Sequence, residues 1–192
     1  MMEVLKQRIL SEGRAVGKEV LLVDSFINHQ VDPQLMAQIG DEFARIFRGV
    51  EATRVATIET SGIAPAMMTA LALKVPLVIM KKSVSAILSE ELLQTPVHSF
   101  TKGSNYLLTV KRRFIQPQDR VLFIDDFLAN GEAALGAAKL IAMAGAQVAG
   151  MGCVIEKAFQ PGRARLQGEG YNPVALASIA WMEDGTIQFT EE

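Results

Sequence analysis

Residues 121–133, VLFIDDFLANGEA, decide the fold of this chain. The first four, residues 121–124, are all apolar and do not alternate with polar side chains, so they predict a strand that is buried on both faces. Asp125 and Asp126 follow at the point where we expect this strand to end. A short loop, residues 127–131, then leads to a helical pattern over residues 132–144.

This order of strand, glycine-containing loop and helix start predicts an anion site. Free backbone N–H groups and the positive end of the helix dipole both point toward such a loop. The two acids before the loop would repel a phosphate, and a ribose diol or a Mg²⁺ ion between them would remove that conflict. The residues together indicate a phosphorylated sugar, with its hydroxyls on Asp125 and Asp126 and its phosphate in the loop.

The same stretch resembles the phosphoribosyl-diphosphate motif of the type I phosphoribosyltransferases, in which an apolar strand, two acids and a phosphate loop follow in this order. The common form of that loop carries two threonines and a second glycine. Here the loop reads Ala129-Asn130-Gly131-Glu132-Ala133, so a phosphate depends more on backbone N–H groups and on the Asn130 side chain. It is similar to the loop of bacterial xanthine phosphoribosyltransferases. The resemblance runs along nearly the whole chain, through SFINHQ, ETSGIAP, SFTKG, DDFLANGEA and EKAFQPG.

Length and composition fit one α/β domain. The chain has 192 residues, 49% of them hydrophobic, which is ample for one core. A net charge of −2 argues against a broad nucleic-acid surface. The single cysteine, Cys153, lies in an apolar run, which favours a buried thiol. No apolar run approaches the ~18 residues of a membrane span, and the N-terminal stretch lacks the apolar core of a signal peptide. We therefore expect a cytoplasmic protein without a membrane partner.

Apolar strands and helices alternate along most of the chain. Strand patterns lie at 20–23, 55–58, 76–80, 121–124 and 147–155, and helical patterns lie at 2–12, 33–48, 64–73 and 132–144. Asp32 before Pro33 marks the start of the second helix. Strands that are separated by helices predict a doubly wound parallel sheet, in which ligands bind at the carboxyl ends of the strands.

Some segments depart from this alternation. Residues 24–30 are too polar and too short for the core. Residues 83–104, of mixed polarity, predict an irregular active-site lid, and residues 105–113 predict the strand that returns from it. Residues 174–181 and 186–189 flank a turn and predict a small hairpin.

The resemblance implies how the ends of the chain are used. Members of the family carry a hood over the sheet that holds the base. We expect this hood from about residues 1–31 and 172–192, within a single phosphoribosyltransferase domain that spans residues 1–192.

Phosphate contacts are expected at three places besides the acids. The resemblance places the ribose 2′- and 3′-hydroxyls on the catalytic acids, Asp125 and Asp126, and the 5′-phosphate on residues 129–133. The turn ETSGIAP resembles the diphosphate loop of the family. The resemblance implies that the backbone N–H groups of Thr60, Ser61 and Gly62 face the leaving group. Lys81, next to Lys82 at the end of a strand, and Lys102 in the lid are further diphosphate candidates, although a lysine pair is ordinarily surface charge.

Base contacts are expected after the last long strand and in the hood. In family members that use 6-oxopurines, a lysine at the position of Lys157 donates to O6, and an aromatic residue at the position of Phe159 lies over the base. Leu21 and Asn28 fall in the segment that resembles the base contact of xanthine enzymes. An amide both donates and accepts, which suits the 2-oxo group and ring N–H of xanthine.

These features predict a purine salvage enzyme. It would convert xanthine and 5-phosphoribosyl 1-diphosphate to xanthosine 5′-monophosphate and diphosphate. Mg²⁺ would be held through the substrate, with Asp125 and Asp126 as candidate protein ligands. The resemblance also implies a homodimer.

Alternatives stay open. Guanine and hypoxanthine share the 6-oxo group, so a guanine/hypoxanthine enzyme is one of them. A non-catalytic regulator that senses phosphoribosyl diphosphate is another, although the net charge does not favour a DNA-binding role. Adenine is disfavoured, because its 6-amino group is a donor and would face the donor Lys157.

Overall fold

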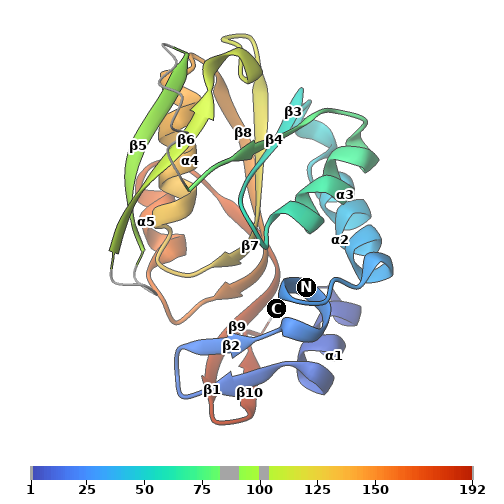
Figure 1. Cartoon of the computed structure of the whole chain (residues 1–192). Coiled ribbons are helices and arrows are strands. Elements are labelled where there is room, and N and C mark those ends of the chain that lie inside the picture. Colours follow the sequence, from blue (N-terminus) through green and yellow to red (C-terminus); the bar gives the residue numbers. More distant parts are fainter. Residues whose placement is uncertain (1, 83–90, 100–103, 192) are drawn as a thin grey trace.

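The computed structural model describes residues 2–82, 91–99 and 104–191 (Figure 1). Its elements are, in chain order, α1 (Glu3–Glu12), β1 (Arg14–Val16), β2 (Val20–Leu22), η1 (Asp24–Asn28), α2 (Pro33–Ile46), η2 (Arg48–Val50), β3 (Arg54–Ile58), α3 (Ile63–Leu73), β4 (Leu77–Met80), β5 (Leu92–Ser99), β6 (Ser104–Lys111), η3 (Arg112–Phe114), β7 (Arg120–Leu128), α4 (Glu132–Met143), β8 (Gln147–Lys157), α5 (Gly162–Gly168), β9 (Pro173–Glu183) and β10 (Thr186–Phe189).

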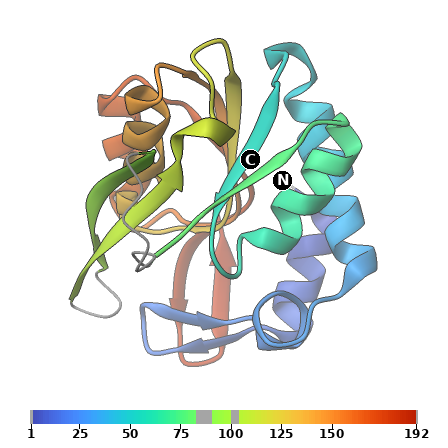
Figure 2. The same ribbon diagram turned by 45° about the horizontal axis from the view of Figure 1, so that its top comes forward.

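A six-stranded sheet forms the centre, in the order β10-β9-β8-β7-β3-β4. Neighbouring strands from β9 to β4 are parallel, and only β10 runs antiparallel, against β9. Helices α2 and α3 lie on one side of the sheet, and α4, α5 and the β5–β6 hairpin lie on the other (Figures 1 and 2). The structure therefore confirms the predicted doubly wound, mostly parallel sheet.

The apolar run at the start of β7 is buried on both faces, as its sequence predicts. Leu122 and Ile124 pack into the core under α2 and the N-terminal segment. Val121 and Phe123 pack into a second core, together with α4 and the β5–β6 hairpin. Because side chains alternate across a strand, four consecutive apolar residues fill both cores at once.

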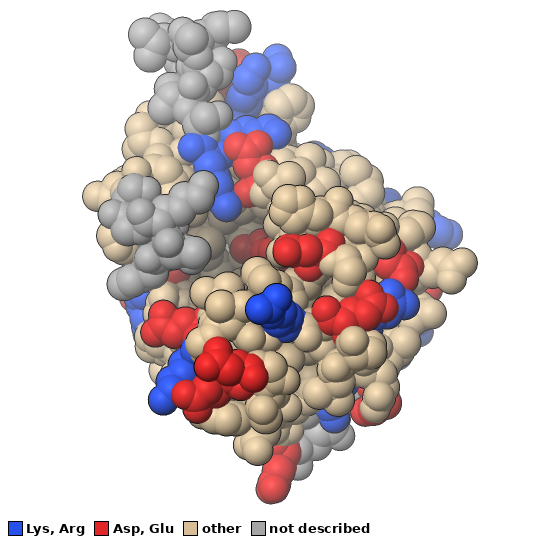
Figure 3. Space-filling model, turned by 60° about the horizontal axis from the view of Figure 1, so that its bottom comes forward, with Lys and Arg blue, Asp and Glu red and all other residues tan. Residues whose placement is uncertain are grey.

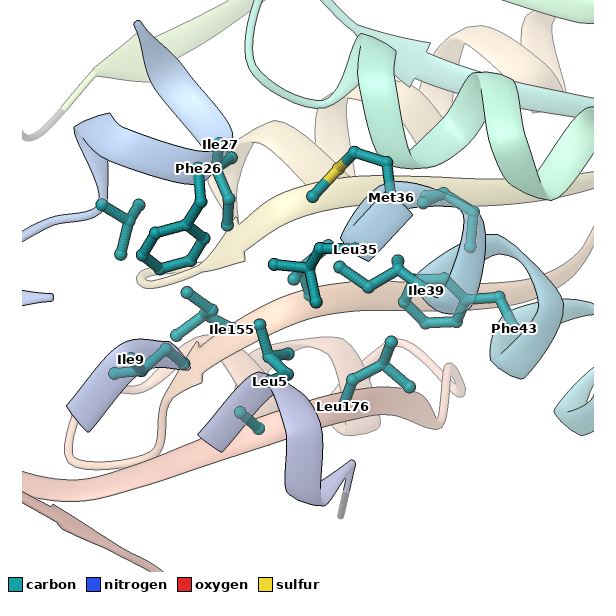
Figure 4. Close-up of a cluster of buried hydrophobic side chains, with 14 of the residues drawn as sticks. Leu5, Ile9, Phe26, Ile27, Leu35, Met36, Ile39, Phe43, Ile155 and Leu176 are labelled. Carbon is teal, nitrogen blue, oxygen red and sulfur yellow. The ribbon is translucent and has the colours of Figure 1, made fainter. Parts of the chain in front are cut away.

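The N- and C-terminal segments pack together over one end of the sheet. The N–H of Met2 donates to the oxygen of Leu176 at 2.7 Å, and the N–H of Gly17 donates to Oδ1 of Asp184 at 2.9 Å. Their shared core extends under α2 (Figure 4) and includes Leu5, Ile9, Phe26, Ile27, Leu35, Met36, Ile155 and Leu176. These two segments are the ones from which the hood is predicted.

The start of α2 follows its sequence signal. Asp32 is the N-cap, and its Oδ1 accepts hydrogen bonds from the N–H groups of Gln34 at 3.0 Å and Leu35 at 3.1 Å. Pro33 occupies the first helical position, where its missing N–H costs nothing. None of the helices in the described part of the chain is long and apolar enough to cross a membrane.

Two predictions about local structure were wrong. The strand does not end at the acids, because β7 continues through Asp125 and Asp126 to Leu128 and pairs with β8 along the way. Residues 24–30 are not excluded from the core either. Most of that segment forms the π-helix η1, in which Phe26 and Ile27 are 0% and 1% exposed, because these two apolar side chains pack in the core that α1 and α2 share.

The predicted lid is partly regular. Residues 91–99 contain β5, which pairs with β6 along its whole length and packs on α4. Leu93, Thr95 and Val97 alternate as its buried side chains, so the signal was a period of two that Pro96 obscured. Residues 83–90 and 100–103, with Lys102 among them, lie outside the described residues. The short elements β1 (Arg14–Val16) and α5 (Gly162–Gly168) were not predicted from the sequence.

Candidate active site

A cavity of about 400 Å³ lies at the carboxyl ends of the central strands. All five residues of the loop 129–133 line it, together with Asp125 and Phe127 from β7, Lys82 just after β4, and Tyr106 from β6. In the space-filling view, basic and acidic side chains surround a hollow in the surface (Figure 3). The structure therefore brings the predicted phosphate loop and the first predicted acid into one cavity.

Asp125 and Asp126 differ in their placement because β7 continues through them. Successive side chains of a strand point to opposite faces, and Asp125 is the one that lines the cavity. The Oδ1 atom of Asp125 accepts a hydrogen bond from the N–H of Asp126 at 3.0 Å. The Oδ1 atom of Asp126 accepts one from the N–H of Phe127 at 2.9 Å. Asp125 lines the cavity, and the Asp126 carboxylate lies close enough to it to raise its pKa.

Asp125 is held in an unfavourable setting for a charge. Loss of solvent and the neighbouring Asp126 carboxylate raise the pKa of Asp125 well above its ordinary value, while the Lys82 ammonium acts in the opposite direction. A carboxylate in this state is stabilised by any cation or hydroxyl that enters the cavity. Such a perturbed acid in a cleft is a functional-site candidate on physical grounds.

The phosphate loop owes its shape to two glycines. Gly131 has φ +82° and is the N-cap of α4, a left-handed conformation that favours glycine. A Cβ at Gly131 would lie 3.2 Å from Cα of Gly162, and a Cβ at Gly162 would lie 2.2 Å from the oxygen of Ala129. Among the described residues, no side chain caps α4, so its first N–H groups remain available to an anion.

The predicted diphosphate loop reaches the acids. A Cβ at Gly62 would lie 2.6 Å from Oδ1 of Asp125 and 2.4 Å from Oγ1 of Thr57, so only glycine lets the loop approach this closely. The peptide bond between Glu59 and Thr60 is cis. Thr60 and Ser61 line a second, mostly apolar cavity of about 370 Å³.

The two lysines after β4 have different surroundings. Nζ of Lys81 forms an ion pair with Glu59 at 2.9 Å, and its side chain is half exposed. Lys82 lines the main cavity, and its Nζ lies 5.8 Å from the ring centre of Tyr106. Lys82 is therefore better placed than Lys81 to reach a diphosphate in that cavity.

Lys157 joins the hood to the sheet. Its Nζ donates to the oxygen of Glu19 and lies 5.5 Å from the ring centre of Phe127. Loss of solvent lowers the pKa of Lys157, and the charges of Glu19 and Asp126 oppose that shift. Because Phe127 also lines the main cavity, this contact places the ammonium next to the candidate site.

The other predicted base contacts are dispersed. Leu21 is buried in β2, at 6% exposure, and Phe159 is 39% exposed after β8. Asn28 ends η1 and lines the second cavity with Thr60 and Ser61. Asn28 thus lines the second cavity, whereas Lys157 lines neither of the two cavities described above.

A buried ion pair that sequence reasoning missed fixes the segment after β8. Glu156, 2% exposed, accepts two hydrogen bonds from Arg163 at 2.7 and 2.6 Å and one from Ser178 at 2.7 Å. Arg163 also donates to the oxygen of Pro173 at 2.8 Å. The pair secures α5 against β8 and β9. An acid at the end of an apolar strand, with arginines after the following Pro-Gly, was the available signal.

The chain is similar to curated relatives along its whole length. No family model matches it. The xanthine phosphoribosyltransferase 1 of Clostridium botulinum is 56% identical over 190 residues, which cover 99% of this chain and 100% of the relative. The xanthine phosphoribosyltransferase of Clostridium acetobutylicum is 53% identical, covering 98% and 100%. That of Ectopseudomonas mendocina is 50% identical, covering 99% and 100%.

Solved structures of adenine phosphoribosyltransferases share the fold. The enzyme from Rhodothermus marinus superposes with a TM-score of 0.74 at 24% identity, over 92% of this chain and 97% of its own. The one from Trypanosoma brucei, solved with AMP, pyrophosphate and ribose-5-phosphate, has a TM-score of 0.76 at 19% identity, over 91% and 79%. With relatives of 50–56% identity over the full length, this chain belongs to the xanthine phosphoribosyltransferases, within the type I phosphoribosyltransferase family.

Proposed function

We propose that the protein transfers the phosphoribosyl group of 5-phosphoribosyl 1-diphosphate to xanthine, which yields xanthosine 5′-monophosphate and diphosphate in purine salvage. One observation carries this proposal beyond the family: an acid with a raised pKa and an uncapped, glycine-shaped phosphate loop line the same cavity. Full-length relatives named for this activity support the choice of reaction.

Each part of the substrate has a matching group on the chain. The 5′-phosphate would lie on the loop 129–133, and the ribose hydroxyls would contact Asp125 and Asp126. The diphosphate would lie between Gly62 and Lys82. This placement orients C1′ toward the base, which is a positioning effect of the kind that contributes several kcal/mol to catalysis.

The chemistry needs little covalent work from the protein. The bond from C1′ to the diphosphate oxygen breaks as the bond from C1′ to a ring nitrogen of the base forms, and the nitrogen loses its proton to solvent. Positive charge develops on the ribose in between. Asp125 and Asp126 stabilise that charge, because carboxylates in a partly dehydrated cavity interact with it more strongly than water does.

Mg²⁺ fits this site as a partner of the substrate. Magnesium prefers oxygen ligands and keeps several from water or phosphate. No group of three or more acidic, histidine or cysteine side chains in the described part of the chain is arranged to hold a metal by itself. Asp125 and Asp126 would therefore hold the ion together with the substrate, and the ion would neutralise charge on the leaving group.

Lys157 is the group that we propose for selecting the base. An ammonium has three donors and no acceptor, and one of its donors goes to Glu19. Within the described ranges the other donors have no hydrogen-bond acceptor, so they could serve an acceptor at the purine 6-position, which favours an oxo group over an amino group. The 2-position would be recognised by Asn28. If it is not, the 2-oxo group would be recognised elsewhere, for example by the backbone near Leu21.

We also propose a homodimer in the cytoplasm. Helix α3 exposes two large apolar side chains, Met67 at 49% and Leu71 at 68%, and Met67 borders the apolar second cavity. A second copy on this face would bury them. Sedimentation of the purified protein tests this, and a monomer at micromolar concentration contradicts it.

A panel of bases tests the proposed function. Purified protein, Mg²⁺ and 5-phosphoribosyl 1-diphosphate would be combined with xanthine, guanine, hypoxanthine or adenine, and diphosphate release measured, with a chelator control. We expect the highest kcat/KM for xanthine, by about tenfold or more over the other 6-oxopurines, and no release with adenine. Preference for guanine or hypoxanthine selects the alternative enzyme. Binding without release for every base selects the regulator.

A further inference from the structure

The phosphate loop contains an acid of its own. Glu132 is the first residue of α4 and lines the main cavity. A helix start favours a negative charge, so the Glu132 carboxylate and a phosphate compete for the same position and repel each other. A cation beside Glu132 would reduce this repulsion and favour the binding of a phosphate.

Arg165 of α5 supplies that cation. Its NH1 nitrogen lies 2.7 Å from Oε1 of Glu132. The same nitrogen donates to the backbone oxygen of Asn130 at 2.8 Å. The Arg165 and Glu132 side chains are 37% and 27% exposed, so solvent screens the pair only in part. Arg165 is not among the residues that line the cavity, and it holds the loop from its other side.

Helix α5 also fixes the direction of two peptide groups. The N–H of Gly162 donates to the oxygen of Ala129 at 2.9 Å, and Arg165 takes the oxygen of Asn130. Both following peptide bonds are trans, since the one cis bond among the described residues is Glu59–Thr60. In a trans peptide the N–H points opposite to the C=O. The N–H groups of Asn130 and Gly131 therefore point away from these α5 contacts, in a loop that lines the cavity.

We infer that Arg165 is a positioning residue for the 5′-phosphate: it cancels the charge of Glu132 and fixes the Asn130 carbonyl, so that the loop 129–133 presents N–H groups to a phosphate. The inference rests on the proposed function, in which this loop holds the 5′-phosphate. A purely structural role, in which the pair only holds α5 against α4, would lower the thermal stability of the variants and leave the affinity for phosphate unchanged.

A double-mutant cycle separates these two roles. The variants are Arg165→Ala, Glu132→Gln and the two combined, with Arg165→Lys as the conservative replacement. Arg45→Ala is the matched control, because it removes a comparable Arg–Glu pair on α2, where Arg45 meets Glu42 at 2.8 Å. The readouts are the KM for 5-phosphoribosyl 1-diphosphate, the KM for xanthine, and the Kd of ribose 5-phosphate by calorimetry, with thermal unfolding as a check on folding.

We expect Arg165→Ala to raise the KM for 5-phosphoribosyl 1-diphosphate and the Kd of ribose 5-phosphate by about 30-fold, and the KM for xanthine by less than about twofold. In the Glu132→Gln background the same substitution should cost only about threefold, because no charge is left unpaired. Arg165→Lys should lose about threefold to fivefold. Arg45→Ala should match the wild type.

Unchanged phosphate affinity in Arg165→Ala overturns the inference, and so does a double variant as impaired as Arg165→Ala. Ribose 5-phosphate binding also keeps this test separate from the proposed function. If the wild type does not use xanthine but Arg165→Ala still weakens ribose 5-phosphate, the proposed reaction fails and the role of Arg165 stands. If the wild type uses xanthine and Arg165→Ala binds normally, the reverse holds.

Discussion

Two aspartates at opposite ends of β7 have opposite environments. Asp119 directly precedes the strand and is 5% exposed, and its carboxylate accepts hydrogen bonds from Thr53 Oγ1 at 2.9 Å, Arg54 Nε at 2.7 Å and the Gln116 N–H at 2.7 Å. Asp125, near the other end, accepts the Asp126 N–H and lies beside a second carboxylate. Three hydrogen-bond donors, one of them an arginine, compensate the charge of Asp119, whereas the charge of Asp125 has one backbone donor and a neighbouring acid among the described residues.

The pKa values differ in the same sense. Burial acts to raise the pKa of Asp119, but the Gln116 N–H, Arg54 and Thr53 outweigh it and hold the pKa below its usual value. Burial and Asp126 raise the pKa of Asp125. Asp119 therefore contributes stability that is lost as the pH falls through its folded pKa, whereas any contribution of Asp125 is lost as the pH rises through its own. The amino end of the strand stabilises the fold, and the carboxyl end is left for a ligand.

We expect the largest loss of activity when both acids near the carboxyl end of β7 are replaced. Asp125→Asn combined with Asp126→Asn should lower kcat by about 1,000-fold or more, because both charges that face the developing positive ribose are removed. The fold should survive, since neither carboxylate has a cationic partner at hydrogen-bond distance among the described residues. Steady-state diphosphate release and circular dichroism are the measurements. Near-normal turnover in the double variant would remove Asp125 and Asp126 from the mechanism.

A substitution at the amino end of β7 should instead affect stability. Asp119→Asn should lower the free energy of unfolding by about 2–3 kcal/mol, because Arg54 loses its carboxylate partner in a largely buried site. The kcat/KM of the folded enzyme should stay within about twofold of the wild type. Urea unfolding and assays at low temperature measure the two quantities. A large loss of kcat/KM without a loss of stability would contradict the division between the two ends.

Two further substitutions, Lys157→Ala and Asn28→Leu, test which side chains select the base. A hydrogen bond from a charged group contributes roughly 1.5–3 kcal/mol, so Lys157→Ala should lower kcat/KM about 10- to 100-fold for every 6-oxopurine. Asn28→Leu should instead reduce the preference for xanthine over hypoxanthine, because only xanthine carries a 2-oxo group. Ratios of kcat/KM decide the matter. An unchanged xanthine-to-hypoxanthine ratio in Asn28→Leu would place recognition of the 2-oxo group elsewhere.

The smallest expected effect tests the pKa of Asp125 directly. Asp125→Asn alone should raise the stability by about 1 kcal/mol, or Tm by about 2–4 °C, at pH values above the folded pKa of Asp125, because it removes a carboxylate that is poorly compensated. The gain should disappear at low pH, where Asp125 of the wild type is protonated and neutral as well. Calorimetric Tm values across pH check this. A gain that does not depend on pH would show that the charge is not its cause.

The parts of the fold that the sequence predicts well are those whose local and tertiary signals agree. Asp32 and Pro33 mark α2 because capping is a local interaction, and the run 121–124 marks a central strand because it fills both cores. The end of β7 was placed too early because polar residues usually leave a sheet. Here pairing with β8 keeps Asp125 and Asp126 in the strand.

The sequence motifs indicate which segments form the candidate site, but they do not show most of the side-chain contacts within it. The loop 129–133 and Asp125 do share a cavity. Which of two adjacent lysines faces that cavity depends on how Glu59 pairs with Lys81, and a sequence does not show this. The contact between Arg165 and Glu132 joins α5 to α4 across a long stretch of chain, so no local pattern announces it.

A crystal structure with xanthosine 5′-monophosphate would show where each part of the product lies, and so whether the loop 129–133 and the two acids hold it. We expect the phosphate within about 2.7–3.2 Å of the Asn130 and Gly131 N–H groups, the ribose hydroxyls on Asp125 or Asp126, and the 6-oxo group next to Lys157. A phosphate that lies away from the loop 129–133, with the ribose out of reach of both acids, would contradict this expectation.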